Sequence, residues 1–214
     1  LVPIMGALHD GHLTLVTLGN RKSDRVVVSI FVNPTQFGPT EDLSRYPRDE
    51  AGDARKLGFA VADLIWAPTA EDMYPEGFAT TVVPKGAALP LEGAFRPHHF
   101  AGVATVCTKL FSQVTPDIAI FGEKDYQQLC VIRQLVRDLN LPLRIVAAPT
   151  SRERDGLARS SRNAYLTADE RAAAPALHRA IKGLAAIAAK GGLVNKAIDV
   201  ATHDLLQAGF AKVD

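Results

Sequence analysis

Short apolar runs alternate with helical patterns over the first 150 residues, and this alternation constrains the fold more than any other feature. Residues 25–32 form a nearly continuous, β-branched run, which is typical of a strand buried on both faces of a sheet. Similar, shorter runs occupy residues 62–66, 117–121 and 143–147, and helical patterns cover residues 12–18, 49–57, 103–114 and 124–139. The pattern predicts β-α-β units around a parallel sheet, that is, a doubly wound, Rossmann-like α/β domain.

The character of the chain changes after Pro149. Residues 151–162 form a polar stretch with four arginines, and a capping-box pattern at Thr167 and Glu170 then opens a helix. Alanine-rich helical sequence continues to Lys190, and a last helical pattern covers residues 194–208. We therefore expect two domains: residues 1–150, and a smaller C-terminal α+β domain over residues 151–214.

Both ends of the sequence look like parts of strands. The sequence opens on Leu1-Val-Pro-Ile4 without a methionine, and it stops shortly after Phe210 in what reads as the start of another strand. We expect the sequence to be a piece of a longer polypeptide, with an incomplete C-terminal domain.

The composition excludes several classes of protein. Apolar residues make up 47% and mean hydropathy is +0.05, which excludes a disordered chain. No apolar run approaches the ~20 residues of a membrane span. The 24 basic and 23 acidic residues nearly balance, which argues against nucleic-acid binding through overall charge. Cys107 and Cys130 form no C-x-x-C motif, so we expect buried thiols and a cytoplasmic location.

The first chemistry-bearing segment is Pro3-Ile-Met-Gly-Ala-Leu-His-Asp-Gly-His-Leu13. Here a strand ends, Gly6 and Gly11 allow a tight turn, and a helix begins near His12. The N-terminus of a helix favours anions, and His9 and His12 can donate hydrogen bonds to phosphate oxygens. Alternatively, the two histidines lie on the surface, or form half of a metal site that would need a third ligand.

Other nucleotide-binding and hydrolase motifs are absent from the sequence. It has no G-x-G-x-x-G, no G-x-x-x-x-G-K-[ST] and no G-x-S-x-G. Dinucleotide-binding, P-loop and α/β-hydrolase interpretations therefore lose their main support.

Two further segments follow predicted strands. Asn33 and Gln36 stand at the carboxyl end of the strand at residues 25–32, where neutral amides suit hydroxyl and carbonyl groups. Lys124 can neutralise phosphate charge and Asp125 can bind ribose hydroxyls or position Mg²⁺, with Gln128 one turn further along. Taken singly, the segment with Asn33 and Gln36 is better interpreted as a plain Asn-Pro turn. The segment from Lys124 to Gln128 is equally well interpreted as a solvated first turn of a helix.

The fourth segment lies in the C-terminal part. Residues 151–162 end in Arg159-Ser-Ser-Arg-Asn163, and arginines with hydroxyls on a loop are suited to hold phosphates. A solvated basic loop is the alternative.

Together these segments resemble the pantoate–β-alanine ligases, members of the nucleotidylyltransferase superfamily with its His-x-x-His signature. The resemblance covers nearly the whole chain. It rests on Met5-Gly-Ala-Leu-His-Asp-Gly-His12, Phe31-Val-Asn-Pro-Thr-Gln-Phe37, Tyr46-Pro-Arg48, Glu92-Gly-Ala-Phe-Arg-Pro97, His99-Phe100, Phe121-Gly-Glu-Lys-Asp125 and Ser160-Ser-Arg-Asn163.

The resemblance implies a role for each matching position. His12, His9 and Lys124 would be catalytic, with His12 as the proton donor, and Gln36, Gln128 and Asn33 would bind pantoate and β-alanine. ATP would contact Met5, Gly6, Ala7, Leu8, His9, Asp10, Gly11, His12, Gly122, Glu123, Lys124, Asp125, Ser151, Arg159, Ser160, Ser161 and Arg162. Arg159 replaces an apolar residue of the family pattern, so a backbone contact is expected there. Ile4, His98 and Arg154 also depart from that pattern.

The resemblance also implies the reaction. Pantoate would attack Mg·ATP to give pantoyl adenylate and pyrophosphate, and β-alanine would then displace AMP. A homodimer formed through the first domain, without nucleic acid or membrane partners, is expected. Two alternatives remain: another nucleotidylyltransferase, which would need a cationic pocket where this chain offers neutral amides, and a non-enzymatic nucleotide-binding protein, which would not need the intact motif side chains.

Overall fold

The computed structural model describes residues 1–39 and 41–213. The chain forms two compact units, Leu1–Thr150 and Ser151–Asp214, and each is described by itself.

The first unit is built on parallel strands. β1 (Val2–Ile4), β2 (Val27–Ile30) and β3 (Leu64–Trp66) pair in that order, and β4 (Ile118–Gly122) pairs with β5 (Arg144–Ala148). Leu1 joins the two groups, because its amino group donates to the Ile118 carbonyl at 2.8 Å and its carbonyl accepts from the Ile120 N–H at 2.9 Å. These bonds have the pattern of a parallel pair, so the strand order is β3-β2-β1-β4-β5.

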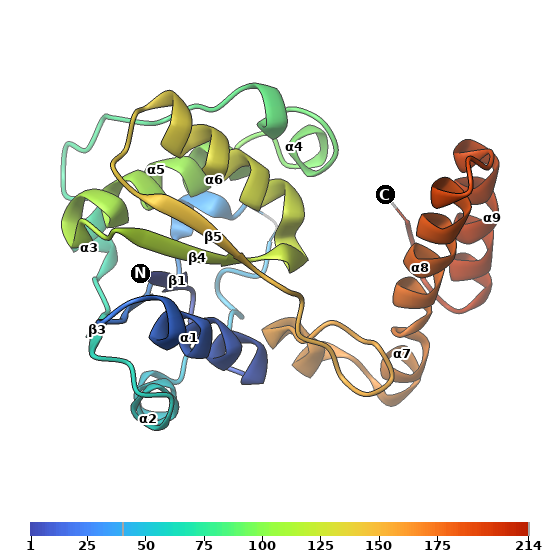
Figure 1. The fold of residues 1–214 in the computed structure, drawn as a ribbon, viewed down its shortest axis with the longest axis horizontal. Coiled ribbons are helices and arrows are strands. Elements are labelled where there is room, and N and C mark those ends of the chain that lie inside the picture. Colours follow the sequence, from blue (N-terminus) through green and yellow to red (C-terminus); the bar gives the residue numbers. More distant parts are fainter. Residues whose placement is uncertain (40, 214) are drawn as a thin grey trace. The chain divides into compact units, whose positions relative to one another are not determined.

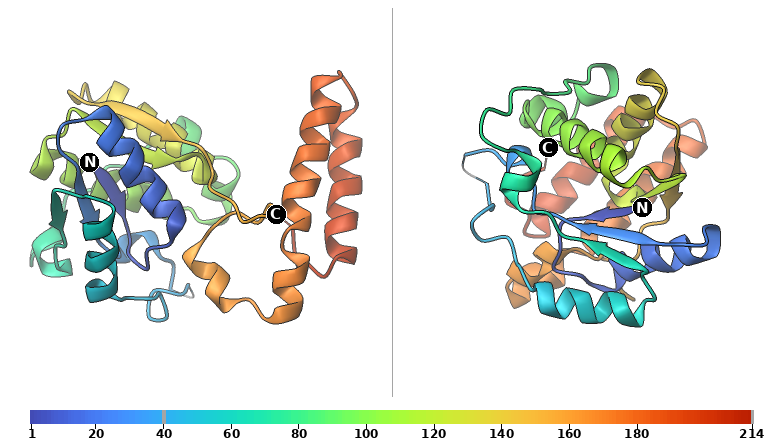
Figure 2. Two further views of the ribbon diagram at one scale, coloured as in Figure 1. Left: turned by 60° about the horizontal axis from the view of Figure 1, so that its bottom comes forward. Right: turned by 90° about the vertical axis from the view of Figure 1, so that its left-hand side faces the viewer.

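Helices cover both faces of these strands (Figure 1). α1 (Asp10–Lys22) and α2 (Glu50–Phe59) lie on one face, and α5 (His99–Val114) and α6 (Tyr126–Asp138) lie on the other. Figure 2 (right) shows the green α5 and the cyan α2 on opposite sides of the blue strands. The strands alternate between two cores: Ile120 packs with the α1 and α2 side, and its neighbours Ala119 and Phe121 pack with the α5 and α6 side.

Short elements connect these layers. Among the described residues they are η1 (Pro34–Gln36), α3 (Ala70–Met73), η2 (Gly86–Ala88), α4 (Glu92–Phe95) and η3 (Glu123–Asp125). Two of them carry residues of the candidate site. η1 follows β2 and contains Gln36, and η3 directly follows β4 and contains Lys124 and Asp125.

The second unit consists mainly of helices. Its elements are η4 (Ser161–Tyr165), α7 (Ala168–Ala173), α8 (Ala176–Ala189) and α9 (Val194–Gln207). The capping box predicted at Thr167 and Glu170 is present at the start of α7. Among residues 151–213 the only β pairing is the isolated antiparallel bridge between Arg152 and Ala158.

The predicted α/β fold class is confirmed, and the differences in the first unit lie at the ends of elements. The α+β class expected for residues 151–214 stays a prediction, because the described part of this unit has helices and one isolated bridge. The helix expected from residue 124 begins at Tyr126, because residues 123–125 form a 3-10 turn first. The helix expected from residue 103 begins earlier, at His99. Within the described ranges, no helix is both long and apolar enough to cross a membrane.

Gly102 sets the contact between α5 and η1. A Cβ at this position would lie 2.4 Å from the Thr35 carbonyl oxygen and 2.9 Å from the Gln36 nitrogen, closer than packed atoms tolerate. We expect Gly102→Ala to lower the free energy of unfolding by about 1–3 kcal/mol despite the better helix propensity of alanine. Gly58→Ala in α2 is the control, because no atom lies within 4 Å of its added Cβ. Equal stability of the two variants in urea unfolding would contradict this packing argument.

Candidate active site

A sharp turn joins β1 to α1 and carries the residues expected to contact ATP. Gly6 has a φ of +92° and Ala7 a φ of +51°, both in the left-handed region that L-residues rarely adopt. A Cβ on Gly6 would lie 3.2 Å from Asp53 Oδ2 and 3.3 Å from Ile30 Cγ2, so there is little room for a side chain. The turn thus passes close to its neighbours and brings His9 to the start of α1.

The two histidines cap α1 and stack on each other. His9 Nδ1 accepts from the Gly11 N–H at 3.1 Å, and the His9 N–H donates to His12 Nδ1 at 3.3 Å. Their ring centroids lie 4.0 Å apart with an interplanar angle of 25°. We assign the tautomers from these bonds: a nitrogen that accepts carries no proton, so each ring holds its proton on Nε2. Both outer nitrogens are therefore hydrogen-bond donors.

His12 is uncharged at neutral pH. Burial, followed by the charges of His9, Lys124 and Lys56, lowers the pKa of His12 to about 3, while Asp125 opposes this. The ring can therefore donate a neutral N–H to an oxyanion but does not bring a positive charge of its own. The lysines that act on the His12 ring, Lys124 and Lys56, supply positive charge beside it.

The carboxyl end of β4 lies beside the histidines. Lys124 and Asp125, in the turn after Gly122, form an exposed ion pair with an Nζ–Oδ1 distance of 3.0 Å. The charges of both act on the pKa of His12: Lys124 lowers it and Asp125 raises it. Because β1 and β4 are neighbours, residues 5–12 and 122–125 meet where the strand order reverses, the usual ligand site of an open α/β sheet.

Gln36 reaches the same edge of the sheet. Its Nε2 lies 3.9 Å from the Met5 Sδ, as a donor to sulfur. Its backbone carbonyl accepts from Arg96 Nη2 at 3.1 Å and faces His99 Nδ1 at 3.1 Å. The Gln36 side chain is therefore fixed beside the β1–α1 turn.

Asn33 supports Gln36 from within the protein. It is only 1% exposed, and its Nδ2 donates to Gln36 Oε1 at 3.0 Å and to the Gly102 carbonyl at 3.2 Å. Its Oδ1 accepts from the hydroxyls of Tyr74 at 2.7 Å and Thr35 at 3.0 Å. Both ends of the amide are thus used to hold the η1 turn, and direct contact of Asn33 with a substrate stays a prediction.

Arg96 has a role that was not predicted from the sequence. This side chain binds Glu41 with two nitrogens, Glu92 at 2.7 Å and the Gln36 carbonyl, and so ties α4 to the η1 turn. The hydrogen bond from Arg96 lowers the pKa of Glu41. The spacing of Glu92 and Arg96, four residues apart on one helical face, was the available signal.

The remaining predicted site residues, Gln128, Ser151 and residues 159–162, lie on other elements than the histidine pair. Gln128 is half-buried in the first turn of α6. Ser151 and residues 159–162 belong to the second unit, where the Ser151 carbonyl accepts from the Arg159 N–H at 3.0 Å and Arg159 pairs with Glu153 at 3.3 Å. Ser160 caps η4 by accepting from the Arg162 N–H. The arginine stretch is therefore an ordered hairpin within its own unit.

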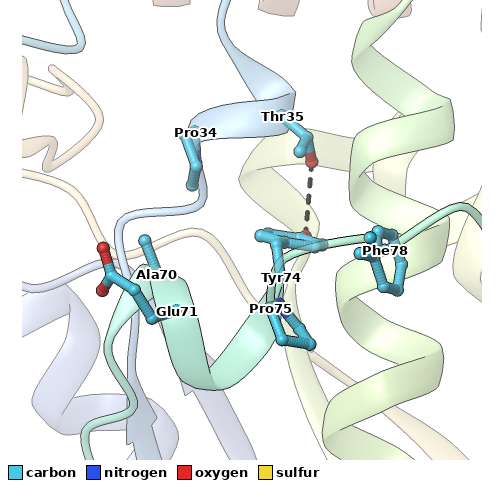
Figure 3. Close-up of a pocket in the computed structure, with 8 residues that line it drawn as sticks. Pro34, Thr35, Ala70, Glu71, Tyr74, Pro75 and Phe78 are labelled. Carbon is cyan, nitrogen blue, oxygen red and sulfur yellow. Dashed lines mark hydrogen bonds between the residues drawn. The ribbon is translucent and has the colours of Figure 1, made fainter.

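A surface hollow of about 370 Å³ lies between η1 and α3 (Figure 3). Its lining includes Pro34, Tyr74 and Phe78, and the Thr35 and Tyr74 hydroxyls lie 3.3 Å apart across it. The residues to which the resemblance gives a catalytic or binding role do not line this hollow. The candidate site is therefore the strand-end cluster around His9 and His12.

Metal-ligand geometry was the alternative explanation for the histidine pair. Among residues 1–39 and 41–213, no group of three or more histidine, cysteine, aspartate or glutamate side chains could hold a metal ion. The Nδ1 atoms of His9 and His12 are also occupied by helix capping. Hydrogen-bond donation by the two Nε2 atoms is the function that this geometry supports.

The low pKa of His12 can be measured directly. We expect its ring to stay neutral, with the proton on Nε2, from pH 7.5 down to about pH 4 in ¹H–¹⁵N NMR spectra of the imidazoles. In the unfolded chain the ring takes up a proton near pH 6.5, so folding stability should fall as the pH drops from about 6.5 towards 3. A His12 ring that titrates near pH 6.5 in the folded protein, like a histidine in a short peptide, would contradict the burial argument.

Known proteins are similar to this chain in sequence and in fold. The pantoate-beta-alanine ligase family profile matches residues 1–214. A pantothenate synthetase of Bradyrhizobium sp. is 59% identical over 211 residues, which are 98% of this chain and 75% of that protein. One from Rhodospirillum rubrum is 56% identical over 214 residues, covering 100% of this chain and 76% of the relative.

Solved structures agree. The crystal structure of pantothenate synthetase from Thermus thermophilus matches with a TM-score of 0.92 and 52% identity, over 97% of this chain and 75% of that one. A pantoate-beta-alanine ligase from Francisella tularensis, complexed with beta-gamma ATP and beta-alanine, matches with a TM-score of 0.84 and 36% identity, over 100% of this chain and 80% of that one. This chain belongs to the pantoate–β-alanine ligase family.

Proposed function

We propose that this chain catalyses the ATP-dependent condensation of pantoate with β-alanine to pantothenate, through a pantoyl adenylate, with release of AMP and pyrophosphate. Family membership supports the overall reaction. The observation that carries the assignment to a site is the meeting of the His9–His12 pair with the Lys124–Asp125 turn at the β1–β4 edge.

We assign ATP to residues 5–12 and 122–125 of the first unit. For the second unit, contacts of Ser151 and residues 159–162 with ATP stay the expectation that the resemblance implies. The structure of the Francisella relative, complexed with beta-gamma ATP and beta-alanine, supports a nucleotide site in this family. In this chain the turn at Gly6 and Ala7 brings backbone close to the site, and the Nε2–H groups of His9 and His12 can bind phosphate oxygens.

In the first step a carboxylate oxygen of pantoate attacks the α-phosphorus of ATP. A new O–P bond forms as the bond to the bridging oxygen breaks, and its electron pair leaves with pyrophosphate. Negative charge accumulates on the oxygens around the α-phosphorus, where the two neutral imidazole N–H groups and the Lys124 ammonium stabilise it. Gln36 beside Met5 and Gln128 on α6 would hold pantoate through neutral hydrogen bonds.

In the second step the amine of β-alanine attacks the activated carbonyl carbon. The C–N bond forms, the C–O bond to AMP breaks with its electron pair leaving on the phosphate of AMP, and the amine nitrogen loses a proton to water. AMP is a good leaving group, so the reaction needs no acyl-enzyme and no protein nucleophile.

Mg²⁺ fits this site as a companion of ATP. It is usually bound by one or two carboxylates together with substrate phosphates, and Asp125 is a carboxylate close to His12. Such an ion neutralises phosphate charge. A homodimer formed through residues 1–150 and a cytoplasmic location complete the proposal; the exposed apolar side chains of Leu64 and Trp66 on β3 are consistent with an interface at the sheet edge.

A product assay tests the reaction. ATP, pantoate and β-alanine together should yield AMP and pantothenate, and omission of either acid should stop turnover. ADP and inorganic phosphate as products would contradict adenylate chemistry, and no turnover with the complete mixture would contradict the function itself.

Substitutions at His12 and Gln36 should separate catalysis from pantoate binding. His12→Ala removes a donor to the developing charge, so we expect kcat to fall by about 10²–10³ with the fold retained. Gln36→Ala loses neutral hydrogen bonds of roughly 0.5–1.5 kcal/mol each, so the KM for pantoate should rise about 2- to 15-fold while the KM for ATP stays near that of the parent. Near-normal kcat in folded His12→Ala, or an equal rise of both KM values in Gln36→Ala, would contradict the assignment.

A further inference from the structure

Two side chains of α2, Asp53 and Lys56, form hydrogen bonds with the backbone of Leu8, the residue before His9. The Leu8 N–H donates to Asp53 Oδ1 at 2.8 Å, and the Leu8 carbonyl accepts from Lys56 Nζ at 2.8 Å. Asp53 and Lys56 also face each other, with an Oδ1–Nζ distance of 3.7 Å. The backbone N–H and the carbonyl of Leu8 are therefore both bound by one ion pair, whose two members are three residues apart on α2.

Asp53 is placed where a carboxylate is costly. It is 1% exposed, and burial of a carboxylate is tolerated only where hydrogen bonds and an opposite charge compensate it. Both oxygens face the β1–α1 turn, since Oδ1 binds Leu8 and Oδ2 lies 3.2 Å from a Cβ built on Gly6. The compensation for this buried charge thus comes from the turn itself and from Lys56.

The turn needs such support. Gly6 and Ala7 adopt left-handed conformations, and α1 begins only at Asp10, so Leu8 is outside the hydrogen-bond ladder of the helix. The Leu8 side chain is buried, which would leave its peptide groups without water if α2 did not bind them. The peptide that precedes His9 is therefore fixed by tertiary contacts and not by secondary structure.

We propose that Asp53 and Lys56 are positioning residues that hold Leu8 and, through it, set the placement of the His9 and His12 rings for the transfer at the α-phosphorus. His9 follows Leu8 directly, and the His9 N–H is the donor that orients His12. A shift of Leu8 therefore moves both rings together. The inference rests on the proposed function, because it concerns the rate of that reaction.

Misplacement of reacting groups by about 1 Å can cost 10²-fold in rate. Loss of the hydrogen bonds from Asp53 and Lys56 to Leu8 should therefore lower kcat. The KM values should stay near those of the parent, because other residues make the contacts with the substrates. A direct contact of Lys56 with ATP would instead raise the KM for ATP and would not depend on Asp53.

Lys56 gives the cleaner test, because its side chain is 43% exposed and can be changed without opening the core. We expect Lys56→Met to lower kcat for AMP formation about 10-fold, with the KM for ATP and the KM for pantoate within 2-fold of the parent. Lys56→Arg should recover most of this loss, because a guanidinium can still donate to the Leu8 carbonyl. Arg55→Met is the matched control, since Arg55 is exposed on the same helix and carries the same charge.

Asp53 supplies the second arm. Asp53→Leu removes the acceptor of the Leu8 N–H, whereas Asp53→Asn keeps an oxygen at that position, so kcat should fall at least 10-fold more in the leucine variant. Amide hydrogen exchange reports the geometry without activity: the Leu8 N–H should be protected in the parent and in Asp53→Asn, and should exchange at least 10-fold faster in Asp53→Leu. If Asp53→Leu does not fold, Lys56→Met decides the question by kcat, with Lys56→Arg as the variant that should recover it.

The outcomes separate this inference from the proposed function. A parent protein that does not form AMP would refute the proposed function. The protection of the Leu8 amide would still test the hydrogen bond from Leu8 to Asp53. An active parent whose Lys56→Met variant keeps kcat within 2-fold would overturn the positioning role. So would a Lys56→Met variant that changes only the KM for ATP, or losses of kcat that match those in Arg55→Met.

Discussion

The pairing of β1 with β4 is the contact on which the site depends. It consists of two hydrogen bonds made by Leu1, to Ile118 and Ile120, and it places the two strands side by side in parallel. The carboxyl end of β1 leads into the histidine turn, and that of β4 leads into Lys124 and Asp125. Without this pairing, segments more than a hundred residues apart in the sequence would not meet.

The site gains its chemical character from burial and capping. The helix start would ordinarily be capped by a serine, threonine, asparagine or aspartate, but here His9 and His12 cap it reciprocally. This use of both Nδ1 atoms fixes the tautomers, and burial keeps His12 neutral. The imidazoles therefore act as oriented hydrogen-bond donors, and Lys124 carries positive charge near them.

Much of the fold could be predicted from the sequence, because β-branched runs such as residues 25–32 and helical patterns such as residues 124–139 follow local rules. The ends of elements could not, since they depend on hydrogen bonds; the turn at residues 123–125 is one example. Burial of Asn33 was equally out of reach, because its partners Tyr74 and Gly102 are 41 and 69 residues away. Asp53 carries no local motif at all, and only the tertiary structure brings it to Leu8, 45 residues earlier.

In the proposed reaction this site activates a carboxylate as an adenylate before any amine takes part. Isotope exchange tests it most directly: with the full-length protein, ATP and pantoate, labelled pyrophosphate should enter ATP in the absence of β-alanine, because the first step runs backwards from bound pantoyl adenylate. The exchange should be lost in His12→Ala. Exchange that requires β-alanine, or exchange of labelled phosphate in its place, would contradict the account.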